Sequence, residues 1–381
     1  MTTPPTDRNP EPATEPVPAA ETGATTAATD GPRVADLDES ELLARIGPLL
    51  PIGPRTVVPT GDDCAVLAPS DGRVCVTTDI LVEGRHFRRD WGDPYRLGLR
   101  ASAQNLADVA GMGAAPISMV VGLALPGDVP VSWVEDLARG LGDAARAAGA
   151  GVDGGDLSSG DSVVVAVTAL GDLEGRAPVL RSGARPGDVV AHAGVLGRGA
   201  AGYALLDVGL GDAGSAAWAV EGFLAPEPPL AAGPAGAAAG ASAMMDVSDG
   251  LLRDAERIAR ASRVVVDLDD PDDWADLAAL LPPALAVGEA RAARAAVVDA
   301  ELDPASEVRV LRRARTWMLT GGEDHGILAT FPPAAALPDG YRRIGVVRGA
   351  GAESPPRVLI DGADPAALGV NSSGWDHFAG V

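Results

Sequence analysis

The sequence has no lysine, and its thirty basic residues are all arginine. A P-loop nucleotide site depends on its lysine, and Schiff-base catalysis depends on a lysine amine. The absence of lysine therefore excludes a standard P-loop NTPase and an enzyme that forms a lysine imine. Heavy use of alanine, glycine and arginine is also what a GC-rich coding sequence produces, so the missing lysine need not reflect function.

Cysteine and long apolar runs are scarce as well. Cys64 and Cys75 are the only cysteines, and without CxxC spacing they do not make a zinc site. Both lie in apolar, strand-like runs, so we expect two buried thiols in a reducing compartment. No apolar run reaches about 18 residues and no signal peptide is recognisable, which predicts a cytoplasmic protein with no membrane partner.

Negative charge dominates the composition, with a net charge of −23 and an isoelectric point of about 4.4. Only 3% of the residues are aromatic, and no basic face with interleaved aromatic residues is available. Nucleic acid is therefore not expected as a partner. The balance suits divalent cations and metal-bound phosphates, although acidity can also serve solubility alone.

The 381 residues, 46% of them hydrophobic, suffice for two domains with cores of their own. Residues 1–36 are rich in Pro, Thr, Ala and Glu and lack an apolar period, which predicts a disordered tail. Strand and helix patterns then alternate, and the pattern restarts near Arg181. We therefore predict an α/β fold with an N-terminal domain over 37–178 and a C-terminal domain over 179–381.

The stretch from Met244 to Asp254 holds the most suggestive acidic cluster. Asp246 and Asp249 lie three residues apart, and after Gly250 an apolar period predicts a helix. A helix N-terminus offers free N–H groups to an anion, and carboxylates beside it can hold a hard cation. The alternative is an ordinary aspartate cap with a neighbouring aspartate.

Similar acidic clusters recur along the chain. Asp62 and Asp63 start an apolar strand and Asp79 ends the next one, so we expect their carboxylates to converge at one edge of a sheet, unless they are only turn residues. Asn105 and Asp108 share one face of a helix predicted over residues 96–113, which is either a solvent face or a ligand face. The last cluster is a predicted glycine-rich loop over residues 149–156, which ends at Asp156 and is either a ligand loop or a tight turn.

These carboxylates can share one cleft only if cations neutralise them. Ligands that are all oxygen, with no Cys or His set, favour Mg²⁺ over zinc. Mg²⁺ commonly joins carboxylates to phosphates, so the chemistry indicated is phosphoryl transfer, with arginine and several Mg²⁺ ions stabilising the charge. The carboxylates concerned are Asp62, Asp63, Asp79, Asp108, Asp156, Asp246 and Asp249.

An ordered series of short motifs resembles the thiamine-monophosphate kinase family, over about residues 37–381. The series is Gly-Asp-Asp-Cys-Ala at 61–65, Thr-Thr-Asp at 77–79, Gly-Arg-His-Phe at 84–87, Asn-Leu-Ala-Asp at 105–108, Gly-Gly-Asp at 154–156, Arg-Ser-Gly at 181–183, Asp-Val-Ser-Asp-Gly at 246–250, Gly-Gly-Glu-Asp at 321–324 and Trp-Asp-His-Phe at 375–378. Each motif is modest, but their order is specific.

The resemblance implies ATP-dependent phosphorylation of thiamine monophosphate to thiamine diphosphate by direct in-line transfer. It also implies two domains of the aminoimidazole-ribonucleotide-synthetase-like superfamily, with an N-terminal mixed sheet that pairs across a homodimer and a C-terminal α/β domain. ATP would be the co-substrate and several Mg²⁺ ions the cofactor. No residue would form a covalent phosphoenzyme.

By matching position, the resemblance assigns three groups of site residues. The expected metal ligands are Asp63, Thr77, Thr78, Asp79, Asp108, Asp156, Asp246 and Asp249. The expected ATP contacts are Gly155, Asp156, Arg181 and Ser248. The expected contacts to the thiamine substrate are His86, Glu323 and Trp375.

Other interpretations stay open at this point. His86 can be a solvated loop histidine, Glu323 a turn residue, and Trp375 an anchor for the C-terminus in place of a stacking partner. Another enzyme of the same superfamily would act on a ribonucleotide amide or a carbamoyl group. A selenophosphate-synthetase-like role is disfavoured, since that family uses a reactive Cys or selenocysteine beside a lysine. Lastly, the chain can be a non-catalytic cation-binding protein whose aspartates are turns and caps.

Overall fold

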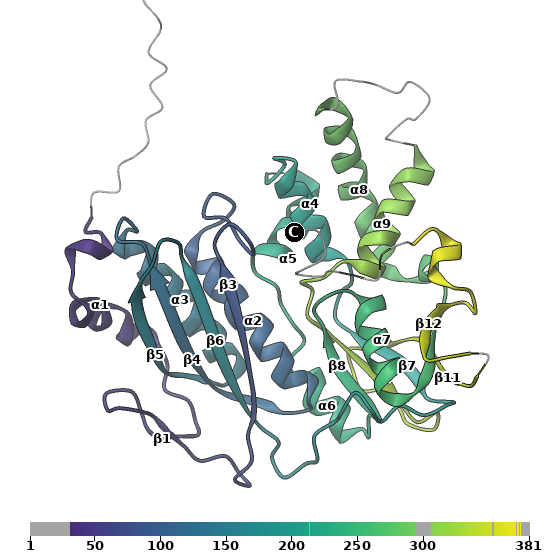
Figure 1. The fold of residues 1–381 in the computed structure, drawn as a ribbon, viewed down its shortest axis with the longest axis horizontal. Helices are drawn as coiled ribbons and strands as arrows, with labels where there is room; N and C mark the ends of the chain where they lie inside the picture. The colour runs from purple at the N-terminus through teal and green to yellow at the C-terminus, as the bar shows by residue number, and fades with distance from the viewer. Residues whose placement is uncertain are drawn as a thin grey trace, which may run out of the picture. The chain divides into compact units, whose positions relative to one another are not determined.

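The structure, a computed structural model, describes residues 31–212, 214–294, 306–352, 354–370, 372 and 374 (Figure 1). Its compact unit begins at Pro32, so residues 32–36, which were predicted to belong to a disordered tail, are part of the folded chain. The reason is backbone pairing: Val34 N–H donates to the carbonyl of Val129 and Ala35 N–H to that of Gly127, both at 2.9 Å. Within these ranges no helix is both long and apolar enough to cross a bilayer.

The N-terminal sheet has the strand order β3 (Cys75–Val82), β6 (Val164–Asp172), β4 (Ala115–Leu125) and β5 (Gly151–Ser159). β6 is antiparallel to both neighbours, whereas β4 and β5 are parallel. Parallel strands need a crossover, which α3 (Val131–Ala148) supplies. In β6 every second residue is buried, as expected for a strand with one covered face.

Helices α2 (Pro94–Gly111) and α3 cover one face of this sheet (Figure 1). α2 begins where Asp93 accepts the N–H of Arg96 at 2.8 Å, with Pro94 at the first helical position. α3 ends at Gly149, whose φ of 71° permits the left-handed C-cap. The opposite face of the sheet remains exposed at Val76, Ile80 and Val120.

Smaller elements precede this sheet in the chain. α1 (Glu39–Ile46) begins with a reciprocal capping box between Asp38 and Glu41. Two strands form a separate small sheet, and three-residue 3₁₀ helices lie before and after α1. These elements are β1 (Thr56–Val58), β2 (Val66–Leu67) and the 3₁₀ helices Val34–Asp36 and Gly47–Leu49.

The C-terminal sheet has the strand order β12 (Arg357–Ile360), β9 (Val264–Leu268), β11 (Tyr341–Gly349), β7 (Val189–Ala193), β10 (Gly326–Phe331) and β8 (Ala243–Val247). β12 and β9 are parallel, and the other neighbours are antiparallel. The sheet is therefore mixed, like the N-terminal one, which agrees with the predicted α/β fold.

Helices cover both faces of the C-terminal sheet. The larger core lies on one face, against α4 (Arg198–Asp207), α5 (Ala217–Leu224), α7 (Leu251–Ser262), α8 (Ala275–Arg294) and α9 (Glu307–Thr320). The other face packs on α6 (Ala232–Ala238) and on Ala110 near the end of α2. Short 3₁₀ helices lie at Gly214–Ala216, Pro271–Asp273 and Pro365–Leu368. α2 thus contacts both sheets.

Several local predictions were wrong. The glycine-rich stretch expected as a loop over 149–156 is mostly strand β5, and β8 was not recognised. Cys64 is exposed and Cys75 partly exposed, so neither thiol is buried as expected. Asp62 and Asp63 precede β2, which belongs to the small sheet, so they do not converge with Asp79 at an edge of one sheet.

Candidate active site

A cavity of about 550 Å³ lies where α2 and β3 meet the C-terminal sheet. Four predicted site residues line it: Thr77 of β3, Asp108 of α2, Asp246 of β8, and Arg181, which precedes β7. Much of the remaining wall is apolar, from Val109, Met112, Leu180, Met244 and Met245. An apolar cavity with a few convergent polar groups is typical of a small-molecule site.

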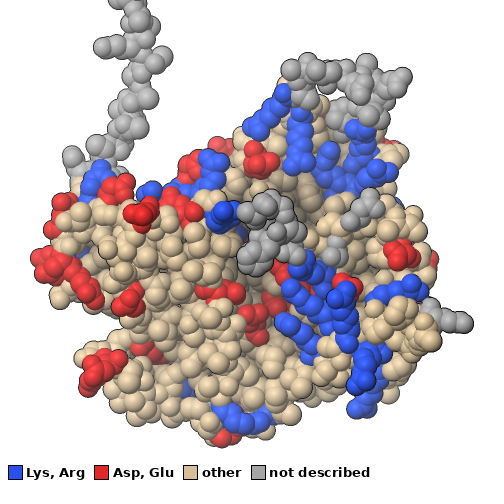
Figure 2. Space-filling view, viewed as in Figure 1, with Lys and Arg blue, Asp and Glu red and all other residues tan. Residues whose placement is uncertain are grey.

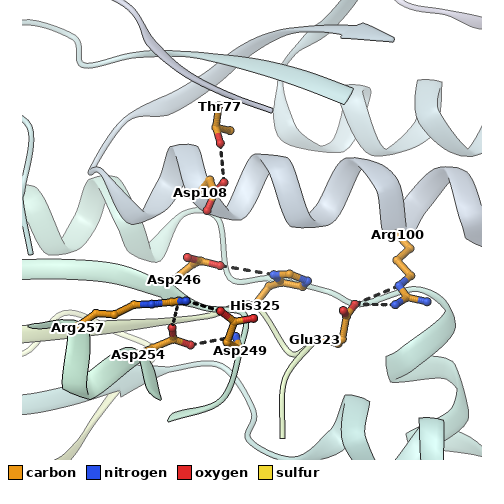
Figure 3. Close-up of polar contacts among 9 residues, drawn as sticks. All are labelled: Thr77, Arg100, Asp108, Asp246, Asp249, Asp254, Arg257, Glu323 and His325. Carbon is orange, nitrogen blue, oxygen red and sulfur yellow. Dashed lines mark hydrogen bonds and ion pairs between the residues drawn. The ribbon is translucent and has the colours of Figure 1, made fainter. Parts of the chain in front are cut away.

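Asp108 projects from α2 toward β3, as the i, i+3 spacing with Asn105 predicts (Figure 3). Its Oδ2 accepts a hydrogen bond from Thr77 Oγ1 at 2.7 Å. Burial and the nearby charge of Asp246 raise the pKa of Asp108 to about 7, although the hydrogen bond from Thr77 opposes this rise. Asn105 is fully buried and accepts the backbone N–H of Asp79 at 2.9 Å.

Asp246 is the penultimate residue of β8 and faces His325, which immediately precedes β10 (Figure 3). Both side chains are buried, and His325 Nδ1 lies 3.5 Å from Asp246 Oδ2. Burial lowers the pKa of His325, but Asp246 and Glu323 outweigh burial and raise that pKa above its usual value. Among the described residues no hydrogen bond closer than this 3.5 Å contact reaches Asp246 Oδ2, so the oxygen can also accept a ligand.

Glu323 accepts two hydrogen bonds from Arg100 of α2, at 2.7 Å from Nη2 and 3.2 Å from Nε (Figure 3). Arg100 is only 3% exposed and also stacks on Phe223, 4.1 Å from the ring centroid. Partial burial opposes ionisation of Glu323, yet Arg100, His325 and His86 lower its pKa below the usual value. His86 accepts the Val82 N–H through Nδ1 at 3.0 Å.

The turn that carries Glu323 and His325 is conformationally unusual. Both residues have positive φ, 73° and 52°, a region that non-glycine residues seldom occupy. The turn packs on the end of β8 and the residue after it: His325 N–H donates to Val247 O at 3.1 Å, and Glu323 N–H donates to Ser248 O at 2.9 Å. Gly322 allows this approach, since a Cβ there would lie 2.3 Å from Ser248 O. Strained backbone of this kind is common at functional sites.

Asp249 follows β8 but does not line the cavity. It pairs with Arg257 of α7 at 2.5 Å, and its N–H donates to Asp254 Oδ2 at 3.1 Å (Figure 3). Asp254 is fully buried, and burial with the charge of Asp246 raises its pKa to about 7. Arginine side chains gather on the surface around α7 in this acidic chain (Figure 2). Asp249 therefore has a strong cationic partner within the protein.

The pleat of the N-terminal sheet divides the predicted metal ligands, because alternate residues of a strand point to opposite faces. Thr77 and Asp79 lie on the face covered by α2. Thr78 lies on the exposed face, where it accepts a hydrogen bond from Thr168 Oγ1 at 3.1 Å. On that exposed face one pairing row crosses the sheet through Ile80, Ala166, Gly122 and Asp156.

The remaining predicted residues lie apart from the cavity or outside the described residues. Asp63 is exposed before β2, and Gly155 lies in β5 so close to β4 that a Cβ would be 2.1 Å from Val121 O. Ser248 lies beside the site and contacts the turn through its carbonyl. Trp375 lies outside the described residues.

Three residues that the sequence analysis did not select also belong to this region: Arg100, Asp324 and His325. Arg100 could have been found from the sequence, because a charged residue is unusual within an alanine- and leucine-rich helix. Asp324 and His325 adjoin Glu323 in the sequence, but their partners depend on long-range contacts that spacing does not reveal. The site is thus held together by pairs of residues from distant segments.

Asp108 and Asp246 fit a hard cation that is shared with phosphate oxygens. Among the described residues, no three His, Cys, Asp or Glu side chains are close enough together to ligate one ion. The two carboxylates nevertheless face one cavity, and the charge of Asp246 raises the pKa of Asp108. Mg²⁺ is usually held by one or two carboxylates together with substrate phosphates and water, so two carboxylates suffice.

Two family models match the chain. They describe the N-terminal domain of AIR synthase related protein, over residues 61–173, and its C-terminal domain, over residues 185–317. A thiamine-monophosphate kinase of Mycobacterium tuberculosis strain H37Rv is 41% identical over 353 residues, which cover 92% of this chain and 95% of the relative. The thiamine-monophosphate kinase of Corynebacterium glutamicum is 37% identical over 358 residues, with 92% and 96% covered.

Solved structures share the fold. One described as AaThiL complexed with AMPPCP and TMP superposes with a TM-score of 0.63 at 28% identity, and the match covers 83% of this chain and 91% of that one. The match therefore extends over both sheets and is not confined to one domain.

Proposed function

This chain belongs to the thiamine-monophosphate kinase family, and from that premise we propose that it transfers the γ-phosphoryl group of ATP to thiamine monophosphate, giving thiamine diphosphate and ADP. The observation that carries the proposal is the placing of two carboxylates, Asp108 and Asp246, in one cavity that also takes Arg181. Two carboxylates that face one cavity suit bound cations, and an arginine suits a phosphate.

The geometry of α2 supports an elongated substrate. Arg100, which holds Glu323, and Asp108 lie eight residues apart on the same helix, which corresponds to about 12 Å at 1.5 Å per residue. We place the aromatic end of thiamine monophosphate beside Glu323 and His86. Its phosphate then lies toward Asp108 and Asp246. Trp375 keeps its expected stacking role as part of the proposal.

We propose direct in-line transfer. A phosphate oxygen of thiamine monophosphate attacks the γ-phosphorus of ATP, and the bond to the β–γ bridging oxygen breaks to release ADP. The attacking phosphate is already an anion, so no strong general base is needed. Arg181 and Ser248 orient ATP, and Glu323 and His86 orient the acceptor. Mg²⁺, held by Asp108 and Asp246 with help from Thr77 and Asp79, would reduce the repulsion between the two phosphate groups.

We also propose that a second copy covers the exposed face of the N-terminal sheet. Val76, Ile80 and Val120 are 66%, 51% and 39% exposed on that face, which is unusual for three neighbouring apolar side chains of one sheet. In such a homodimer Thr78 and Asp156 lie at the interface, and not on the cavity wall with Asp108. Four residues that lie apart from the cavity remain proposed ligand residues. They are Asp63, Gly155 and Asp156, whose surroundings would depend on the dimer, and Asp249, which pairs with Arg257 in the single chain.

The two sheets come from separate parts of the chain, as the proposed division into two domains requires. All strands of the four-stranded sheet fall within residues 75–172, and all strands of the six-stranded sheet within residues 189–360. A boundary near residue 178 separates the two sheets. We propose that residues 37–178 bind metal and ATP and form the dimer, and that Arg181, Asp246 and Ser248 of residues 179–381 complete the metal and ATP sites.

The decisive experiment is an assay with ATP and Mg²⁺ that compares three acceptors: thiamine monophosphate, thiamine, and aminoimidazole ribonucleotide precursors as the alternative superfamily substrate. Thiamine diphosphate should form from thiamine monophosphate in stoichiometric amounts with ADP, and thiamine should not be phosphorylated at a comparable rate. Turnover of ATP only with a ribonucleotide amide would replace the proposal with the alternative. No turnover with any acceptor would favour a non-catalytic role.

A further inference from the structure

Three consecutive residues of one turn are anchored to three different elements. Glu323 pairs with Arg100 of α2, and His325 faces Asp246 of β8. Between them, the carboxylate of Asp324 points away from both and reaches the first residues of α4. Glu323 belongs to the proposed substrate site, and His325 lies beside Asp246 of the proposed phosphate site. Asp324 belongs to neither site.

Asp324 caps α4 from a distance of 125 residues or more in the sequence. Its Oδ2 accepts the N–H of Gly197 at 2.5 Å, and its Oδ1 accepts the N–H of Gly199 at 2.7 Å. Gly197 is the N-cap residue and has no side chain with which to cap its own helix. The free N–H groups and partial positive charge of a helix N-terminus favour a carboxylate there. Asp324 is 6% exposed, so this contact is shielded from water.

The turn that carries Asp324 packs closely against neighbouring backbone on two sides. A Cβ on Gly199 would lie 2.9 Å from Gly322 O and 3.1 Å from Glu323 Cβ, so the start of α4 abuts the turn directly. A Cβ on Gly250 would lie 2.6 Å from Thr320 O on the other side. The turn is thus held between the N-termini of α4 and α7, while Glu323 and His325 keep their positive φ angles.

We propose that Asp324 is a positioning residue for the acceptor: by fixing the turn to the N-terminus of α4, it sets the placement of Glu323 and thereby the affinity for thiamine monophosphate. The inference rests on the proposed function, because it assumes that Glu323 contacts that substrate. Asp324 touches neither substrate nor metal in this assignment. Its loss should therefore impair acceptor binding and leave ATP binding nearly unchanged.

Two substitutions test the contact from its two sides. Asp324→Asn keeps the size of the side chain but places an NH₂ group against one of the two N–H donors. Gly199→Ala leaves the charge unchanged and forces the turn away from α4. Matched controls are Asp172→Asn, which alters a 1% exposed carboxylate that accepts the N–H groups of Ser70 and Glu174, and Gly142→Ala, which crowds Leu49 O at 2.4 Å.

The measurement is the KM for thiamine monophosphate and the KM for ATP, each at saturating co-substrate and pH 8, in the full-length protein. Both test variants should raise the KM for thiamine monophosphate at least tenfold and keep the KM for ATP within twofold, whereas the controls should change neither by more than twofold.

Equal changes in both KM values, or no change, would overturn the positioning role. Glu323→Gln separates the two proposals: if it raises the acceptor KM and Asp324→Asn does not, only this inference fails. If wild type forms no thiamine diphosphate, both fail.

Discussion

Arg100 and Glu323, 223 residues apart in the sequence, share an ion pair whose two partners are unequally buried. Arg100 is 3% exposed and lies over the ring of Phe223, whereas the Glu323 side chain is 37% exposed. The pair joins α2 to the turn before β10 (Figure 3). Loss of Glu323 would therefore leave a buried charge without a partner, whereas loss of Arg100 would leave a partly exposed one.

We predict that Glu323→Ala destabilises the fold more than Arg100→Met. Removing Glu323 leaves a buried guanidinium without its carboxylate, which costs about 2 kcal/mol or more. Removing Arg100 leaves a carboxylate that water can reach, and methionine refills most of the volume, so the cost should stay near 1 kcal/mol. Urea unfolding of both variants beside wild type measures the difference. The opposite order would mean that Glu323, and not Arg100, is the desolvated partner.

The strongest sequence patterns predicted their elements correctly. The helix predicted over residues 96–113 corresponds to α2 (Pro94–Gly111), within two residues at each end, and the helix predicted after Gly250 is α7 (Leu251–Ser262). β8 escaped recognition because all five of its residues are buried, and a short run that is buried on both faces has no period to detect. β5 was mistaken for a loop because its glycines allow close approach to neighbouring backbone, as at Gly155 beside Val121 O.

The candidate site was only partly predictable for a related reason. Helical spacing correctly grouped Asn105 with Asp108 on a buried face. The motif Thr77-Thr78-Asp79 was treated as one cluster, although a period of two already requires Thr78 to point away from its neighbours. The pairing of Asp246 with His325 depends on the register between β8 and β10, which no local pattern contains.

The ligand-free protein should lose stability as the pH rises from 6.5 to 8. Burial raises the pKa values of Asp108, Asp254 and Asp324 to about 7, above the usual 3.8, so the folded state holds protons that the unfolded state has already released. By linkage, the free energy of unfolding falls as the pH rises, until these groups are ionised in the folded state. Between pH 6.5 and 8 the three groups together should lower it by on the order of 2 kcal/mol. The raised pKa of His325 acts in the same direction. His192 opposes the fall only weakly, because its pKa of about 3 keeps it neutral in the folded state, and an unfolded histidine, with a pKa near 6.5, is also mostly neutral above pH 7.

Thermal melts in EDTA, without nucleotide, measure this dependence. The melting temperature should fall by a few degrees over that range. Asp254→Asn removes one of the three groups, so its melting temperature should fall less steeply than that of wild type. A melting temperature that is flat or rises between pH 6.5 and 8 would contradict the raised pKa values.

The exposed face of the N-terminal sheet should determine the oligomeric state. Val120 lies in β4 at the centre of that face, so Val120→Asp would place a charge in the proposed interface of each copy. We expect wild type to be a dimer and the variant a monomer with an unchanged fold, because Val120 is 39% exposed in the single chain. Light scattering after gel filtration gives the mass.

Val308→Asp is the matched control for this substitution. Val308 is 69% exposed at the start of α9, on the other domain, so the same change of residue should leave the dimer intact. A Val120→Asp protein that remains dimeric, or a wild type that is monomeric at micromolar concentration, would show that a second copy does not cover this face.

Asp108→Asn should abolish most of the phosphoryl transfer while it preserves the fold. Asparagine keeps the size of the side chain and an oxygen that can accept the Thr77 hydrogen bond, which is 2.7 Å long in wild type. It also resembles the protonated carboxyl that a pKa of about 7 already makes accessible, so the melting temperature in EDTA should be unchanged or slightly higher. The substitution removes one charge between the donor and acceptor phosphates. A hundredfold fall in kcat, about 2.7 kcal/mol in the barrier, is the expected scale.

The rate of thiamine diphosphate formation at saturating ATP and Mg²⁺, beside a circular dichroism melt, separates this role from a structural one. Asp188→Asn serves as the control, since Asp188 is a 4% exposed carboxylate that accepts the Ser242 hydroxyl away from the cavity. A purely structural Asp108 would lose activity only in proportion to its stability, as the control should. If the Asp108→Asn protein keeps its rate within threefold of wild type, Asp108 holds no ion between the phosphates, and the pairing of Asp108 with Asp246 in one metal site is wrong.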